Sequence, residues 1–256
     1  MTLVSHSWFM AVRDLRNLLR QPWFVALSLL QPIIWLLLFG ELFKRITEIP
    51  GFDTSNYIAF LTPGVVIMNA LFGGGWSGMS AVNDLDRGVM DRFLVTPVSR
   101  TAIIVGRMIQ VAVVTIVQAT ILIVLGMILG AGYTNFVGVL TLIVLAILVA
   151  LPFAALSNGL GLLLRQEESV IGANQFILLP LTFLSSVLIA KQVMPAWIAN
   201  VSSYNPANWA VDAARAALPS SPNWGLVFSR LGWLLVLTAV ATWVATRAFR
   251  SYQRSI

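Results

Sequence analysis

The sequence predicts an all-α polytopic membrane protein with six transmembrane helices in a single transmembrane domain, residues 1–256. Two observations support this fold class. Hydrophobic residues make up 58% of the chain and charged residues 10%, and the mean hydropathy is +0.86, whereas a soluble domain carries about a quarter charged residues. The apolar residues are also gathered into stretches that match the roughly 20 residues a helix needs to cross a bilayer.

The segment before the first apolar stretch, residues 5–20, has the periodicity of an amphipathic helix. Apolar side chains recur on one face, and arginines share another face. The apolar positions are Trp8, Val12, Leu15 and Leu19, and the arginines are Arg13, Arg16 and Arg20. We expect this helix to lie in the membrane interface with its arginines near anionic headgroups. The alternative is a solvated N-terminal tail.

Six apolar stretches are predicted to span the membrane. They cover residues 23–43, 57–82, 101–129, 136–164, 169–190 and 226–246. The third and fourth spans divide one uncharged run from Met108 to Leu164, which is too long for a single span. A turn is predicted between them at Gly130-Ala-Gly-Tyr-Thr-Asn135, because glycine and asparagine favour turns.

The orientation of the spans follows from the distribution of arginine and lysine. With six spans, one side of the membrane holds Arg13, Arg16, Arg20, Arg87, Arg92, Arg100, Arg107, Arg165, Arg247, Arg250 and Arg254. The other side holds Lys44, Arg45, Lys191, Arg215 and Arg230. Because positive charge gathers in cytoplasmic loops, both termini are predicted to be cytoplasmic.

A charged island, residues 83–100, lies between the second and third spans and is therefore predicted to be cytoplasmic. Asp84, Arg87 and Asp91 lie three and four residues apart and would form one polar stripe on a helix that begins near Asp84. Its apolar flank consists of Val89, Met90, Phe93 and Leu94, and its other charges are Asp86, Arg92 and Arg100. Thr96-Pro97 would end the helix. We predict a helix over residues 84–97 that a soluble partner could bind.

The segment between the fifth and sixth spans, residues 191–223, is semi-polar and is predicted on the outer side. Prolines interrupt it, and tryptophans in and beside it suit a membrane interface. These residues are Pro195, Pro206, Pro219, Pro222, Trp197, Trp209 and Trp224. Residues 207–218 are good helix formers. The segment could be a re-entrant helical hairpin, which must pack against protein, or an ordinary surface loop.

Uncharged polar residues within the spans have two interpretations. The main candidates are Asn69, Gln118, Asn174 and Gln175, and others are Gln110, Thr115, Thr120 and Asn158. They could line a substrate path or form interhelical hydrogen bonds of about 0.6 kcal/mol each, and the second interpretation is favoured.

Gly73-Gly-Gly75 is interpreted as close helix packing. The centres of the predicted spans hold no ionisable side chain, which argues against an ion-coupled carrier.

Residues that catalysis would need are scarce. The chain has no cysteine and a single histidine, His6, so thiolate chemistry and a histidine-based metal site are not expected. It contains no Gly-x-x-x-x-Gly-Lys-Ser/Thr motif to cradle nucleotide phosphates. The net charge of +6 is attributed to topology signals rather than to nucleic-acid binding. We therefore expect a protein that is not an enzyme and that binds no metal or cofactor itself.

Five motifs along nearly the whole chain carry a family resemblance. The most specific is Arg87-Gly-Val-Met-Asp-Arg-Phe-Leu-Val-Thr-Pro-Val-Ser-Arg-Thr-Ala-Ile-Ile-Val-Gly-Arg107. The others are Arg20-Gln-Pro22 leading into Gln31-Pro32, Thr62-Pro-Gly64, Leu179-Pro-Leu-Thr-Phe-Leu-Ser-Ser186 and Asn205-Pro-Ala-Asn-Trp-Ala-Val-Asp-Ala-Ala-Arg215. Together they resemble the membrane subunits of type-2 ABC exporters, the group of the daunorubicin- and nodulation-factor-type permeases.

The resemblance implies a role for each unusual segment. Residues 5–20 would be the connecting helix, 84–97 the coupling helix, and 191–223 an extracellular re-entrant pair. The ATPase-coupling residues would be Asp84, Asp86, Arg87, Val89, Met90, Asp91, Arg92, Phe93 and Leu94. The re-entrant motif would include Asn205, Pro206, Asp212 and Arg215.

The resemblance also implies partners and a cargo. A second membrane subunit, identical or homologous, would pair with this chain, and two cytoplasmic ABC ATPase subunits would bind ATP and Mg. The complex would export a hydrophobic or amphipathic drug, antibiotic or lipid-like molecule across a bacterial plasma membrane. The alternative readings are an ion-gradient-driven secondary transporter or channel and, with less support, a membrane enzyme.

Overall fold

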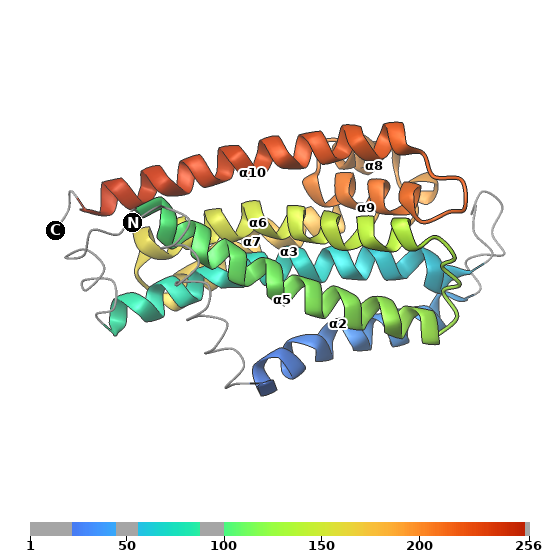
Figure 1. Cartoon of the computed structure of the whole chain (residues 1–256), viewed down its shortest axis with the longest axis horizontal. Coiled ribbons are helices and arrows are strands. Elements are labelled where there is room, and N and C mark those ends of the chain that lie inside the picture. The colour runs from blue at the N-terminus through green and yellow to red at the C-terminus, as the bar shows by residue number, and fades with distance from the viewer. Residues whose placement is uncertain (1–21, 45–55, 88–99, 254–256) are drawn as a thin grey trace.

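The computed structural model describes residues 22–44, 56–87 and 100–253. Every regular element within these residues is a helix. The helices are α2 (Pro22–Leu42), α3 (Tyr57–Asp86), α5 (Arg100–Ile128), α6 (Phe136–Leu164), α7 (Glu167–Phe183), η2 (Lys191–Val193), α8 (Ala196–Ser202), α9 (Pro206–Ala217) and α10 (Trp224–Gln253). The long helices run along the long axis of the molecule, with α3 and α6 in its middle (Figure 1). The predicted all-α fold class is confirmed for the described residues.

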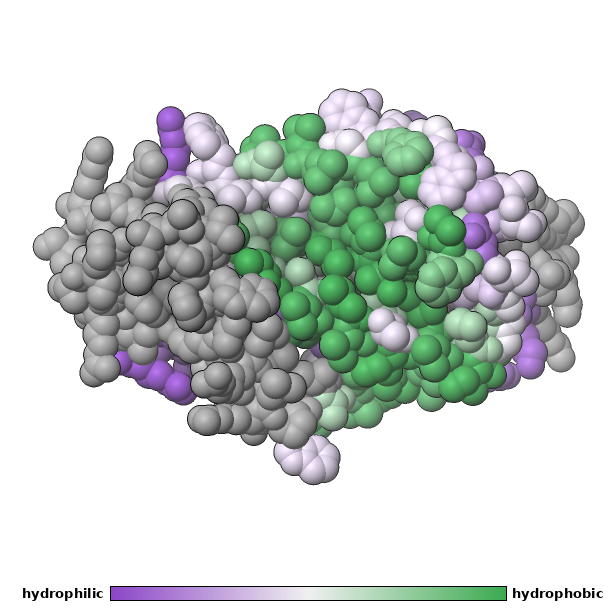
Figure 2. All heavy atoms as spheres, in the orientation of Figure 1, coloured by the Kyte–Doolittle hydropathy of each residue, from purple (hydrophilic) through white to green (hydrophobic). Residues whose placement is uncertain are grey.

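Four helices are long and apolar enough to cross a membrane. They are Tyr57–Asp86, Val105–Ile128, Phe136–Leu164 and Trp224–Arg247, and they correspond to the second, third, fourth and sixth predicted spans. A shorter apolar helix, Ala26–Leu42, occupies the first predicted span. Figure 2 shows hydrophobic side chains, in green, across the middle of the surface and hydrophilic ones toward its ends. Such a surface belongs to a multi-pass membrane protein.

The fifth predicted span, residues 169–190, is not one continuous helix. α7 ends at Phe183, and residues 184–190 are non-helical. The carbonyl oxygens of Leu181 and Leu184, which a continuing helix would use, accept hydrogen bonds from the Asn205 side chain instead. The prediction of a helix to residue 190 is therefore wrong, because side chains from another part of the chain replace the intrahelical hydrogen bonds.

The contact between α3 and α6 forms the core of the bundle. Gly74 of α3 lies so close to the carbonyl of Ala150 that a Cβ atom at position 74 would overlap it. A Cβ atom at Gly75 would overlap the side chain of Leu178 on α7. Small residues let membrane helices approach one another in this way. The interpretation of residues 73–75 as a packing motif is confirmed for Gly74 and Gly75.

A proline inside α3 leaves one backbone carbonyl without its intrahelical donor. Pro63 has no N–H, so the carbonyl of Ala59, four residues earlier, cannot accept the usual helical hydrogen bond. The hydroxyl of Tyr133, in the turn between α5 and α6, donates to this carbonyl at 2.8 Å. Neighbouring side chains commonly satisfy carbonyls freed by proline in membrane helices. Tyr133 thereby ties the turn to α3.

Replacing Tyr133 with phenylalanine should lower the free energy of unfolding by about 1 kcal/mol. The substitution keeps the ring and removes only the hydroxyl that satisfies Ala59. Equilibrium unfolding in mixed micelles would measure the change. Tyr204→Phe is the matched control, because Tyr204 is 83% exposed. Equal stability of the two variants would show that the Tyr133 hydroxyl does not support α3.

Candidate functional site

Polar side chains gather at both ends of the bundle. At one end, α3 and α6 finish and α5 and α7 begin (Figure 1). Both ends of the charged island, residues 83–87 and residue 100, lie there. We call this the island end. At the opposite end, which we call the α9 end, α9 packs beside α3, α6 and α10.

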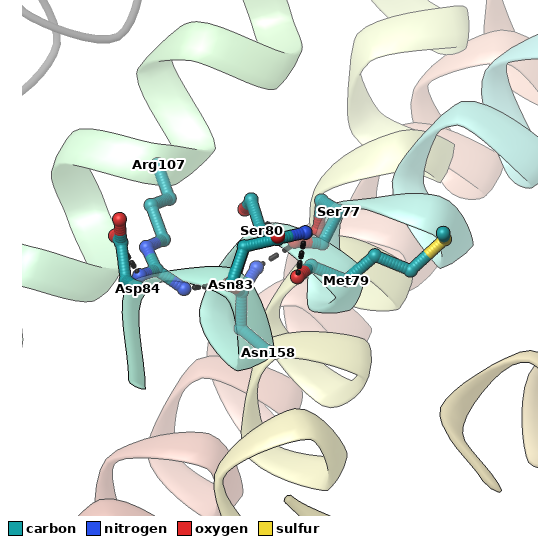
Figure 3. Close-up of polar contacts among 7 residues, drawn as sticks. All are labelled: Ser77, Met79, Ser80, Asn83, Asp84, Arg107 and Asn158. Carbon is teal, nitrogen blue, oxygen red and sulfur yellow. Dashed lines mark hydrogen bonds and ion pairs between the residues drawn. The ribbon is translucent and has the colours of Figure 1, made fainter. Parts of the chain in front are cut away.

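A buried ion pair joins α3 to α5 at the island end. Asp84 lies in the last turn of α3, and its carboxylate oxygen Oδ2 is 2.6 Å from Nη2 of Arg107 on α5. The Arg107 side chain is 6% exposed and that of Asp84 is 19% exposed. The second guanidinium nitrogen of Arg107, Nη1, donates to Oδ1 of Asn158 on α6 at 2.7 Å. One arginine therefore connects three helices, as Figure 3 shows.

Further amides extend this cluster, which we call the inner network, along α3 and to α7. Asn158 Nδ2 donates to the hydroxyl of Ser77 at 2.8 Å, drawn in Figure 3. Asn83 Nδ2, one residue before Asp84, donates to Glu167 Oε1 at the start of α7 at 2.6 Å. A buried charge is stable only when it is paired and hydrogen-bonded. The inner network meets this requirement for Arg107.

The charge pattern predicted that Asp84 and Asp86 begin a separate helix, and this prediction is wrong. They form the last turn of α3, and the helix ends at Asp86. Asp84 turns toward Arg107, whereas Asp86 and Arg87 are exposed. The other predicted coupling residues lie outside the described residues: Val89, Met90, Asp91, Arg92, Phe93 and Leu94. The predicted interfacial helix with Trp8, Arg13, Arg16 and Arg20 also lies outside them.

Sequence reasoning missed the role of Arg107 and Asn158. Arg107 was interpreted only as a topology signal, although it is the last charge before a long uncharged run. Asn158 was one of several polar residues within spans. A lone arginine inside an apolar helix requires a partner. This requirement could have indicated from the sequence that Arg107 is paired.

The polar residues proposed for a substrate path mostly bond to neighbouring helices. Asn69 Nδ2 donates to Gln118 Oε1 at 2.9 Å, and Gln118 Nε2 donates to Ser28 of α2 at 2.7 Å. Asn174 Nδ2 of α7 donates to the carbonyl of Gly75 at 2.7 Å. These are interhelical hydrogen bonds, as the interpretation favoured from the sequence predicted. Half-buried Gln175 makes no hydrogen bond within the described part of the chain.

The four residues of the predicted re-entrant motif come together at the α9 end. Asn205 caps α9 by accepting from the N–H of Ala207 at 2.9 Å, and Pro206 takes the first helical position. Asp212 Oδ2 accepts from Asn208 Nδ2 at 2.8 Å. Arg215 donates to the backbone of residues 60, 186 and 187. Asn208 belongs to this cluster but was not singled out from the sequence.

The two polar clusters connect helices of the bundle. Among the described residues, no group of His, Cys, Asp and Glu side chains could hold a metal ion. The polar clusters tie helices together at the two ends of an apolar bundle, and their side chains are engaged with one another. The fold and the clusters together define a multi-pass membrane protein whose helices are coupled at both ends.

Comparison with known proteins identifies the family. A family model described as ABC-2 type transporter matches residues 6–218. The chain belongs to this family of ABC transporter membrane proteins.

The relatives carry transporter names. The chain is 31% identical over 191 residues to a daunorubicin resistance ABC transporter permease protein, DrrB1, of Streptomyces coeruleorubidus, covering 73% of this chain and 65% of the relative. It is 28% identical over 200 residues to the putative transport permease ycf38 of Cyanophora paradoxa, with 78% and 69% covered. It is 26% identical over 217 residues to the probable multidrug ABC transporter permease YbhR of Escherichia coli K12, with 82% and 56% covered. All three are named as permeases.

Proposed function

We propose that this chain is the membrane-spanning subunit of an ATP-driven exporter. Two membrane subunits, identical or homologous, would enclose the transport path, and two separate ABC ATPase subunits would bind ATP and Mg. The ATPases would contact the charged island, residues 83–100. Support comes from the family and from the permease relatives. The observation that carries the mechanism is the buried Asp84–Arg107 pair, which lies where the island meets the bundle.

The inner network offers a route by which force on the island reaches the helices. The island begins in the last turn of α3 and ends at the first residue of α5. Asp84 and Arg107 join these two helices, and Asn158 adds α6. A push on the island would therefore reach three helices at once and move them as near-rigid bodies. Asn83 and Glu167 would carry the same movement to α7.

The proposed topology places the island end in the cytoplasm. Six spans would then comprise α2, α3, α5, α6, α7 with residues 184–190, and α10, with both termini cytoplasmic. Residues 5–20 would form the interfacial connecting helix and 84–97 the coupling helix. Residues 191–223, which contain α8 and α9, would be the extracellular re-entrant segment. The arginine distribution supports this orientation, and the relatives from Streptomyces coeruleorubidus and Escherichia coli suggest a bacterial plasma membrane.

The proposed cargo is a hydrophobic or amphipathic molecule such as a drug, an antibiotic or a lipid. Relatives are named for daunorubicin resistance, doxorubicin resistance and multidrug transport. The polar amides within the spans are mostly engaged with each other, so they would leave mainly apolar side chains for contact with cargo. A path of this kind suits molecules that partition into the bilayer. Asn69, Gln118, Asn174 and Gln175 remain the candidates for a polar contact with the cargo.

Charge reversal at two aspartates of the island tests the proposal. The variant Asp86→Lys with Asp91→Lys should lower ATP-dependent export at least about tenfold, because like charges across an interface disfavour binding by more than 1.4 kcal/mol. Export into inverted vesicles and co-purification of the ATPase would be measured. Asp84 is left intact, since its partner is Arg107 within this chain.

A matched reversal at the opposite end provides the control. Glu41 is exposed and lies near the end of α2 beside Lys44, so Glu41→Lys should leave export and ATPase binding unchanged. The proposal would be wrong if the island variant exported normally and bound the ATPase normally. Transport by the wild-type chain in vesicles with an ion gradient and no nucleotide would favour the secondary transporter instead.

A further inference from the structure

The break after α7 poses a problem that the fold must solve. α7 has 17 residues and is therefore about 26 Å long, less than the roughly 30 Å of a bilayer core. The non-helical residues that follow are buried, since Ser185, Ser186 and Val187 are 3%, 2% and 0% exposed. Non-helical backbone at membrane depth is tolerated only where protein groups satisfy its carbonyl and N–H groups.

Arg215 satisfies two consecutive carbonyls of this backbone. Its Nη1 donates to the carbonyl of Ser186 at 2.7 Å, and its Nη2 lies 3.2 Å from the carbonyl of Val187. The same Nη2 donates to the carbonyl of Phe60, near the start of α3, at 3.1 Å. The guanidinium also lies over the Phe60 ring, 3.5 Å from its centroid. One side chain on α9 thus holds the broken segment and α3 together.

Other side chains complete the attachment of the broken segment. The N–H of Ser186 donates to Asn208 Oδ1 at 2.9 Å, and the Ser186 hydroxyl donates to Asp212 at 3.3 Å. The Tyr57 hydroxyl on α3 donates to the carbonyl of Leu188 at 3.1 Å. The Val187 carbonyl comes so close to α3 that a Cβ atom at Gly64 would overlap it. The segment is bonded on one side to α9 and packed on the other against α3.

We propose that Arg215 is a positioning residue that locks residues 184–190, α9 and the start of α3 into one rigid unit, which we call the α9 unit. A guanidinium presents five N–H donors in a fixed planar arrangement, and here they reach carbonyls from two separate parts of the chain. Opening the unit would leave a cation and several carbonyls without partners in an apolar environment, at a large cost in free energy.

The consequence for transport rests on the proposed function. If this end of the bundle opens during the ATP cycle, the α9 unit moves as a whole, and α9 does not separate from α7. Any rearrangement would then occur where the unit meets α10. The lock is a property of this chain alone, so it can be tested without an ATPase.

Hydrogen exchange measured by mass spectrometry tests the lock directly. In Arg215→Gln, exchange of the peptide that covers residues 184–190 should accelerate at least about tenfold, since hydrogen bonds to a charged donor are lost. Exchange in α6 should stay unchanged. Arg215→Lys should give the same result, because an ammonium group cannot span the three carbonyls. This second variant keeps the charge and serves if Arg215→Gln does not fold.

Arg230→Gln is the matched control, because Arg230 lies on α10 at the same end of the bundle and donates to no carbonyl of residues 184–190. It should leave exchange of that peptide unchanged. Unchanged exchange in both Arg215 variants would overturn the lock. An increase of equal size across all helices would also overturn it, because it would indicate general destabilisation.

A second arm tests the rigid unit within the assembled transporter. The wild-type chain bound to its ATPase would be trapped with a non-hydrolysable ATP analogue, and exchange of the peptide 184–190 should remain as slow as without nucleotide. Faster exchange of this peptide in the trapped state would contradict the proposal that the α9 unit moves as a whole. Failure to assemble with an ATPase would count against the proposed function and leave the result for the Arg215 variants standing.

Discussion

Replacing Arg107 with methionine should lower the free energy of unfolding by about 3–5 kcal/mol, the cost typical of removing one member of a buried ion pair. The side chain is 6% exposed and bonds Asp84 and Asn158. Methionine fills a similar volume but leaves the Asp84 carboxylate and the Asn158 oxygen without this donor. Equilibrium unfolding in mixed micelles would measure the loss.

The double variant Arg107→Met with Asp84→Leu should recover a large part of this loss. Neither buried charge then remains, and apolar replacements of buried pairs are often neutral or stabilising. A double-mutant cycle isolates the coupling between the two side chains. Arg87→Met, three residues from Asp84 and exposed, is the control and should change stability by less than about 0.5 kcal/mol. Equal effects of Arg107→Met and Arg87→Met would contradict a structural role for the pair.

The same double variant separates stability from coupling in the proposed transporter. It should fold and insert, yet its link between α3, α5 and α6 would be apolar and non-directional. We therefore expect normal ATPase binding with a reduced ratio of export to ATP hydrolysed. This result would distinguish a link that transmits movement from one that only holds the helices together.

The long helices could be predicted from the sequence because their cause is local. Each apolar run from residue 57 to 82, 101 to 129 and 136 to 164 appears as a helix with nearly the predicted ends. Gly130 to Asn135 forms the predicted turn, with Gly130 at φ 103°, a conformation that glycine adopts readily. Hydropathy and turn residues are sufficient wherever a helix satisfies its own backbone.

The interruption of the fifth span could not be predicted in this way, because its cause is distant in sequence. Residues 179–186 are apolar enough to continue a helix. The carbonyls of this segment instead accept hydrogen bonds from Asn205 and Arg215, which lie 21 to 29 residues away in the sequence. Asp84 and Arg107 are likewise 23 residues apart, and the topology argument used Arg107 only as one positive charge. Asn208 did carry a local signal: it lies three residues after Asn205 and four before Asp212, on one face of α9.

Substitution of Gly74 and its neighbour Gly73 should have opposite results although both residues lie in one helix. A Cβ atom at Gly74 would overlap the backbone carbonyl of Ala150, whereas at Gly73 the nearest atom is Gln118 Oε1 at 3.9 Å. Gly74→Ala should therefore lower the free energy of unfolding by about 1–3 kcal/mol, and Gly74→Leu by more. Gly73→Ala should be neutral or slightly stabilising, because alanine favours the helix by up to about 1 kcal/mol.

The contrast is sharp because the obstacle at Gly74 is backbone. A side chain could rotate away from an added methyl group, but the Ala150 carbonyl can move only with α6 itself. Gly74→Leu should thus separate α3 from α6 and reduce the yield of monodisperse protein in gel filtration, as well as its stability. Gly232→Leu on α10, where an added Cβ meets nothing within 4 Å, is the control and should behave like wild type. If Gly74→Leu were as stable as Gly232→Leu, α3 and α6 would not be packed backbone to backbone. They could then slide past one another during transport instead of moving together with the inner network.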